Sequence, residues 1–204
     1  MLNIEALNNA EVIREPYPFL IVPGFVDETA LQVIEKDFPE ISKPGSFPLE
    51  TLRYGSGFNE FMAQLRGPEF RHAVERKLCI NLDNRPTMIT VRGQARARDG
   101  QIHTDSKTKL VTVLVYLNGK WEAPGGRLRM LRGPDNLNDY IAEVPPVQGT
   151  LLAFINKPNA WHGHEPFEGQ RRSIQLNWVT DNGVVVRERL RHSISAFFKR
   201  LKGK

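Results

Sequence analysis

The chain has 204 residues, of which 40% are hydrophobic, and a formal net charge of +5. This size predicts a single domain with a proper core, and the one cysteine, Cys79, excludes an internal disulfide and a cysteine-based zinc cage. No apolar run approaches 18 residues, and residues 1–6 lack the basic start and apolar stretch of a signal peptide. We therefore expect a cytoplasmic protein.

Two helices are expected in the first third of the chain. The first begins after Asp27, which suits an N-cap, and runs to about Phe38 with its apolar residues on one face. The second should run from about Asn59 to Cys79, with a break near Gly67–Pro68. Residues 40–57 between them are rich in Pro and Gly, which predicts a loop that could act as a lid or simply lie on the surface.

The chain from about residue 87 to 180 reads as a series of strands. They are expected at about 87–97, 101–106, 109–117, 126–131, 150–155, 160–164 and 172–180, with Asp99–Gly100 as a hairpin turn. Residues 109–117 are a continuous apolar, β-branched run, which is typical of a fully buried strand. Helices ahead of a run of strands indicate an α+β chain with a β-sandwich at its centre.

Basic residues are concentrated at the end of the chain. Residues 187–204 contain seven Lys and Arg against one Glu, so the preceding 186 residues carry a formal charge of −1. Apolar residues recur there at helical spacing, which predicts a basic amphipathic helix over about 184–202. It could make peripheral membrane contact, but we favour packing on its own domain. Without an RNA-binding motif or a stacking strip of aromatic residues, no nucleic-acid partner is expected.

A metal site is suggested by His103 and Asp105, because residues i and i+2 of an extended strand point the same way. Such a pair alone arises by chance often enough to mean little. A second strand carrying His162 would complete a two-histidine, one-carboxylate facial triad, which is diagnostic of non-haem Fe(II) oxygenases. His164 stands two residues further on and could face the same point.

The order and spacing of several further motifs agree with this interpretation. They are Tyr116–Asn118 at a strand end, Gly125–Gly126 at a strand start, Pro145–Gly149 before Leu151–Phe154, Glu165–Pro166 after His162, Gly169, and Arg172 through Trp178. From about residue 88 to 180 the chain resembles the 2-oxoglutarate and Fe(II)-dependent dioxygenases, with the prolyl-4-hydroxylase-like branch nearest. The resemblance implies one domain over 1–204, with a helical part over about 1–85 and a double-stranded β-helix, or jelly roll, over about 86–181.

The resemblance also implies the chemistry. Fe(II) is held by His103, Asp105 and His162, and 2-oxoglutarate and dioxygen are consumed, with ascorbate as a further stimulant. A C–H bond is hydroxylated, and succinate and carbon dioxide are released. His162 is chosen over His164 because Glu165–Pro166 and Arg172 follow it at the spacing of these enzymes.

Arg172 is the expected anchor for the far carboxylate of 2-oxoglutarate, since guanidinium offers paired donors that match a carboxylate. Trp178 would share its face of the strand, and Arg171 would point away as a solvated charge. A hydroxyl from Tyr116 or Thr112 could reach the same carboxylate, although Tyr116 could equally pack in the core.

The substrate is less well defined by the sequence. Arg92, Gln94, Arg96 and Arg98 alternate before His103 and, with Lys107, could form a basic rim that attracts an anionic substrate or a plain solvated face. A peptidyl residue and a small molecule are both compatible with the pattern. The alternative from another class is a jelly-roll metal-containing binding protein without oxidative activity, and succinate formation would separate the two.

Overall fold

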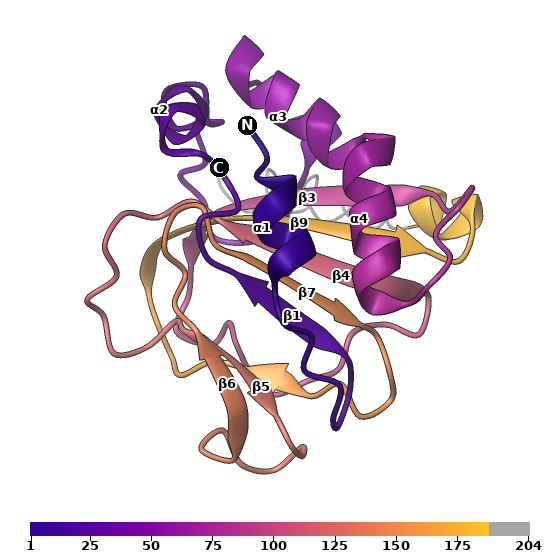
Figure 1. The fold of residues 1–204 in the computed structure, drawn as a ribbon. Coiled ribbons are helices and arrows are strands. Elements are labelled where there is room, and N and C mark those ends of the chain that lie inside the picture. The colour runs from indigo at the N-terminus through magenta and orange to yellow at the C-terminus, as the bar shows by residue number, and fades with distance from the viewer. Residues whose placement is uncertain (188–204) are drawn as a thin grey trace.

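The computed structural model describes residues 1–187, which form two antiparallel sheets with helices on one side (Figure 1). The larger sheet has the order β1-β7-β4-β9-β3-β2 and the smaller sheet the order β6-β5-β8. The strands are β1 (Phe19–Val22), β2 (Phe47–Pro48), β3 (Thr87–Ala95), β4 (Lys109–Tyr116), β5 (Leu128–Leu131), β6 (Tyr140–Val144), β7 (Leu151–Ile155), β8 (His162–Gly163) and β9 (Gly169–Val179). The predicted α+β chain with a double-stranded β-helix core is confirmed.

The helices lie in the N-terminal part of the chain. They are α1 (Ile4–Asn9), α2 (Glu28–Lys36), the 3₁₀ turn η1 (Leu49–Thr51), α3 (Ser56–Arg66) and α4 (Pro68–Leu78). The break predicted near Gly67–Pro68 is confirmed: Gly67 ends α3, and Pro68 is the first residue of α4, where its missing N–H is not needed. The expected helix after Asp27 corresponds to α2.

The two faces of the large sheet have different surroundings. On β4 and β9 one set of alternate residues is apolar and packs against the helices: Val111, Val113, Val115, Ile174, Leu176 and Trp178. The Trp178 ring lies 6.0 Å from that of Phe70 in α4. The other face turns toward the small sheet, where part of it joins a second apolar cluster and the rest is polar. The alternation along each strand thus separates a helix-covered core from an interior pocket.

Several predicted elements need correction. Residues 101–106 are not a strand, because their only ladder contact is an isolated bridge between His103 and His162. Neither β1 nor β6 was expected, and neither was α1. The 40–57 segment is not a free loop, since Phe47 pairs with Val91 of β3 and Pro44 bridges to Gln94.

The described part of the chain ends in a short helical segment. Residues 182–187 are helical, and the rest of the helix predicted over about 184–202 lies outside the described residues. Within residues 1–187, no helix combines the length and apolar character that a membrane crossing requires.

Candidate active site

His103 and His162 are brought together by an antiparallel backbone bridge. The His103 N–H donates to the His162 carbonyl at 3.0 Å, and the His162 N–H donates to the His103 carbonyl at 2.9 Å. The two imidazole rings consequently stand 4.3 Å apart, centroid to centroid. The site therefore depends on β8 and on the irregular segment before β4, and not on the regular strand expected at 101–106.

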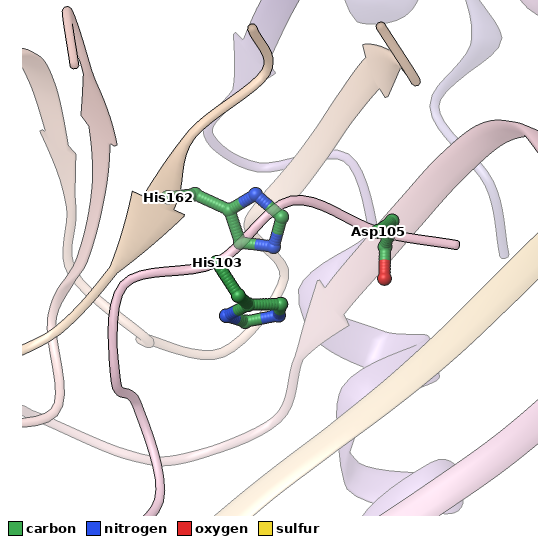
Figure 2. Close-up of side chains that lie close together, drawn as sticks. All are labelled: His103, Asp105 and His162. Carbon is green, nitrogen blue, oxygen red and sulfur yellow. The ribbon is translucent and has the colours of Figure 1, made fainter. Parts of the chain in front are cut away.

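Both histidines are oriented for metal binding through the same nitrogen. The Nδ1 atom of His103 lies 2.8 Å from the Gln101 carbonyl, and that of His162 lies 2.9 Å from the Ala160 carbonyl. A carbonyl only accepts, so each Nδ1 carries the proton and each Nε2 keeps its lone pair. Both rings extend toward the side on which Asp105 lies (Figure 2). One ligand atom from each of the three residues falls within 4.8 Å of the others, so the donor set fits a divalent metal.

Asp105 is held by two donors from β4. The Lys109 ammonium donates to Oδ1 at 2.7 Å, and the Thr112 hydroxyl donates to Oδ2 at 2.6 Å. Burial by itself raises the pKa of the Asp105 carboxyl, but Lys109, His162 and the two hydrogen bonds outweigh it, and the pKa lies below its ordinary value. The carboxylate is therefore ionised at neutral pH, as a metal ligand must be.

His162 is held in the neutral form that binds metal. Its side chain is buried, and burial together with the nearby His103 lowers its pKa to about 4, although Asp105 and the Ala160 carbonyl act in the opposite direction. A neutral imidazole presents an Nε2 lone pair at physiological pH.

His164 has a different environment from His162. Its Nδ1 lies 2.8 Å from the Glu165 carbonyl, and its ring stands against Gly100. Among the described residues it is His162, and not His164, that groups with His103 and Asp105.

These side chains line a cavity of about 270 Å³ between the two sheets. The polar face of β9 and the inward residues of β3 form much of the remaining wall. The lining residues are Ser46, Thr90, Arg92, Asp99, Gly100, His103, Asp105, Lys109, Thr112, Leu114, Leu128, His162, Gly163, His164, Arg171, Ser173 and Gln175. A pocket with a potential metal centre and convergent polar groups is the usual form of an enzyme site.

The two neighbouring arginines of β9 each face the side of the sheet that was expected for the other. Arg171 is buried and lines the pocket, whereas Arg172 lies on the opposite face, where it pairs with Glu35 of α2 at 3.2 Å and stacks over Phe38. Contrary to the prediction, Arg172 therefore does not face the pocket of the metal-site residues. Trp178 shares the face of Arg172 and packs on α4, so its expected place in the pocket is wrong as well.

Arg171 and Tyr116 form a pair with unused hydrogen-bonding capacity. Arg171 donates from Nε to the Gly126 carbonyl at 2.9 Å, and its guanidinium carbon lies 5.3 Å from the centre of the Tyr116 ring. Tyr116 is fully buried, and its hydroxyl has no hydrogen-bond partner within the described part of the chain. Burial lowers the pKa of Arg171 and raises that of Tyr116, so both groups gain from an anion that accepts from them. The Arg171 guanidinium, which lines the pocket, fits a carboxylate, whereas Tyr116 is not among the lining residues.

Thr112 lies in the pocket, but its contacts differ from those expected. Its hydroxyl proton goes to Asp105, and the side-chain amides of Asn156 and Asn177 donate to its oxygen. No sequence signal points to the amides of Asn156, which directly follows β7, and Asn177 of β9, because neither Asn belongs to a motif.

Of the predicted basic rim, only Arg92 lines the pocket. Its guanidinium donates to Asp99 at 2.6 Å and to the Ser46 hydroxyl at 3.1 Å. Arg96 also pairs with Asp99, at 3.0 Å. The Asp99 carboxylate thus neutralises part of the predicted positive charge. Through Ser46, the Pro- and Gly-rich segment at 40–57 also forms part of the pocket wall.

The sequence and the geometry of this site match a known family. Residues 93–180 match the 2OG-Fe(II) oxygenase superfamily, and this range contains all three metal-site residues as well as Arg171 and Tyr116. This segment of the chain belongs to the 2OG-Fe(II) oxygenase superfamily. Its facial triad is intact, and Fe(II) and 2-oxoglutarate are the cofactor and cosubstrate that the superfamily and the triad imply. No curated protein matches the sequence.

Solved structures share the fold at low sequence identity. A prolyl-4-hydroxylase from Pseudomonas putida is 17% identical with a TM-score of 0.58, covering 81% of this chain and 94% of that one. The viral collagen prolyl hydroxylase of Paramecium bursaria Chlorella virus-1, solved with 2-oxoglutarate, is 17% identical with a TM-score of 0.55, covering 79% and 96%. HygX from Streptomyces hygroscopicus, solved with nickel and 2-oxoglutarate, is 14% identical with a TM-score of 0.57, covering 88% and 87%.

Proposed function

We propose that this 2OG-Fe(II) oxygenase hydroxylates a C–H bond of its substrate while 2-oxoglutarate is converted to succinate and carbon dioxide. The observation that carries the proposal is the shared pocket. His103, Asp105, His162 and Arg171 all line one cavity, and the Tyr116 ring lies beside Arg171. Iron bound with 2-oxoglutarate and dioxygen supplies an oxidant strong enough to remove hydrogen from a C–H bond.

Each residue of the pocket has a defined task in this proposal. The two Nε2 atoms and the Asp105 carboxylate hold the metal on one side and leave its other positions open. Arg171 pairs with the far carboxylate of 2-oxoglutarate, and the Tyr116 hydroxyl donates to the same group. The charge-assisted pair fixes the direction of the cosubstrate, so that its keto acid end reaches the metal.

The substrate that fits the remaining wall is polar. Beyond the metal ligands the pocket presents Ser46, Thr90, Arg92 and Gln175, all of which offer hydrogen-bonding groups. Solved relatives include prolyl hydroxylases, one of them in complex with a peptide fragment. We therefore propose a polar small molecule or a peptidyl residue as the substrate, and no nucleic acid.

The direct test supplies the purified protein with Fe(II), ascorbate and 2-oxoglutarate and measures succinate. Candidate substrates, including proline-containing peptides and polar metabolites, are then screened by mass spectrometry for the gain of one oxygen atom. Asp105→Ala is the control, because it removes the anionic metal ligand, and we expect it to form no succinate while its circular dichroism stays native. Wild-type protein that binds Fe(II) but forms no succinate with any substrate would instead indicate a metal-containing binding protein.

A further inference from the structure

We propose that Thr112 is a positioning residue that turns the Asp105 carboxylate toward the metal, and that Asn156 and Asn177 fix the direction of its proton. Thr112 lies in the middle of β4, between β7 and β9, and only 1% of its surface is exposed. In the strand register it stands opposite Phe154 on one side and Asn177 on the other. The hydroxyl is thus anchored in the most enclosed part of the large sheet.

The hydrogen bonds around the Thr112 hydroxyl leave it one orientation. A hydroxyl has one proton and two lone pairs. Asn177 Nδ2 donates to Oγ1 at 2.7 Å and Asn156 Nδ2 donates to it at 3.0 Å, which uses both lone pairs. The proton can then only be given to Asp105 Oδ2, which lies 2.6 Å away. The Asn177 amide is itself fixed, since its Oδ1 accepts from Gln175 at 3.2 Å.

This arrangement matters because Asp105 has no regular strand to orient it. The residue lies in the irregular segment before β4, so its backbone is not held by a ladder on either side. Its other side-chain partner is Lys109, a long ammonium side chain of which 19% is exposed. Thr112 is short, β-branched and buried, so it is the stiffer of the two supports. We infer that it sets the rotation of the carboxylate about its Cβ–Cγ bond.

A purely structural role for Thr112 predicts a different outcome. In that case the hydroxyl only accepts from the two amides, and its loss lowers the stability of the fold without changing the affinity of the folded protein for metal. A positioning role predicts weaker metal binding by protein that remains folded. The inference rests on the proposed metal site, so the affinity of the wild-type protein for metal is measured first.

The experiment is calorimetric titration of the apoprotein with Mn(II), which avoids oxidation of Fe(II). Thr112→Val keeps the shape of the side chain and removes the hydroxyl. Loss of a group that supports a metal ligand typically costs ten- to a hundredfold in affinity, and we expect a loss of about that size. Thr112→Ser keeps the hydroxyl and should bind Mn(II) within about threefold of the wild type, on the same reasoning. Thr150→Val is the matched control, because Thr150 is the other buried threonine of the described residues and lies outside the pocket.

A second variant, Asn156→Ala, tests the same role if Thr112→Val does not fold. Asn156→Ala removes one of the two amide donors, and the Asn156 Oδ1 atom has no partner in the described part of the chain, so little else is lost. Its affinity for Mn(II) should fall between those of the wild type and Thr112→Val, and the absorption spectrum of its Co(II) complex should change. Wild-type affinity in every variant that folds would overturn the positioning role. Failure of the wild-type protein itself to bind Mn(II) would instead contradict the metal site.

Discussion

Arg171 and Arg172 are adjacent in the chain but face opposite sides of β9. Arg171 reaches the pocket, where it can pair with a dicarboxylate, and Arg172 reaches Glu35 of α2 on the opposite side of the sheet. We expect Arg171→Gln to raise the concentration of 2-oxoglutarate required for half-maximal turnover by about ten- to a hundredfold. This corresponds to the loss of a charge-assisted pair of roughly 1.5–3 kcal/mol. Steady-state succinate formation at increasing 2-oxoglutarate measures the effect.

Arg172→Gln is the matched control for this substitution. It removes a partly exposed ion pair with Glu35, which should change the free energy of unfolding by no more than about 1 kcal/mol and leave the 2-oxoglutarate requirement unaltered. If Arg172→Gln raised the requirement and Arg171→Gln did not, the assignment of the cosubstrate end of the pocket would be wrong.

The inward face of β9 could have been predicted from the sequence by a different argument. Arg172 is followed at alternate positions by Ile174, Leu176 and Trp178, an apolar series typical of a face that packs against helices. The other series is polar, with Arg171, Ser173, Gln175 and Asn177, which is unusual for the interior and indicates a pocket. The spacing from His162 alone could not decide between Arg171 and Arg172. A shift of one residue along a strand moves a side chain to the opposite face of the sheet.

At the scale of elements, the turn before His103 determines where the histidines meet. Gly100 has a φ of +95°, and a Cβ there would stand 2.3 Å from the His164 ring. The Gly100 carbonyl also accepts from the His164 N–H at 2.8 Å, so the turn and β8 are held together. We expect Gly100→Ala to lower the free energy of unfolding by on the order of 1–3 kcal/mol, through strain and overpacking, and to weaken metal binding. Chemical denaturation and Mn(II) titration measure the two effects.

Gly119→Ala tests whether any glycine in a turn would behave in the same way. A Cβ at Gly119 meets nothing within 4 Å, and its φ is not in the left-handed region. Its stability and metal affinity should stay close to those of the wild type. Equal losses in both variants would mean that the Gly100 turn has no special relation to the site.

Comparison of several elements shows why some could be predicted from the sequence and others could not. Residues 109–117 and the break at Gly67–Pro68 follow from local pattern, since a long apolar run and a proline each favour one structure. The segment at 101–106 alternates as a strand would, but only one of its residues finds a ladder partner, and pairing is a tertiary property. Short strands such as β1 and β6 likewise depend on neighbours that are distant in sequence.

At the scale of the whole molecule, the site joins parts of the chain that are far apart. The cavity is lined by residues from the segment before β2, from β3, β4 and β5, from the turn at Gly100, and from β8 and β9. A ligand that fills it therefore contacts both sheets at once. Since such a ligand binds the folded state and not the unfolded chain, its binding free energy adds to the stability of the whole domain.

Stabilisation by the metal and the cosubstrate should therefore be measurable without any turnover. With Mn(II) and 2-oxoglutarate in the absence of oxygen, each at about 100 times its dissociation constant, each ligand should add about 2.7 kcal/mol. For a domain of this size, that corresponds to a rise in melting temperature of roughly 5–10 °C for each ligand. Asp105→Ala should lose the response to Mn(II), and Arg171→Gln should keep it while losing about half or more of the response to 2-oxoglutarate. The two variants thus separate the ends of the pocket, and a full response to both ligands in either one would contradict the role assigned to that residue.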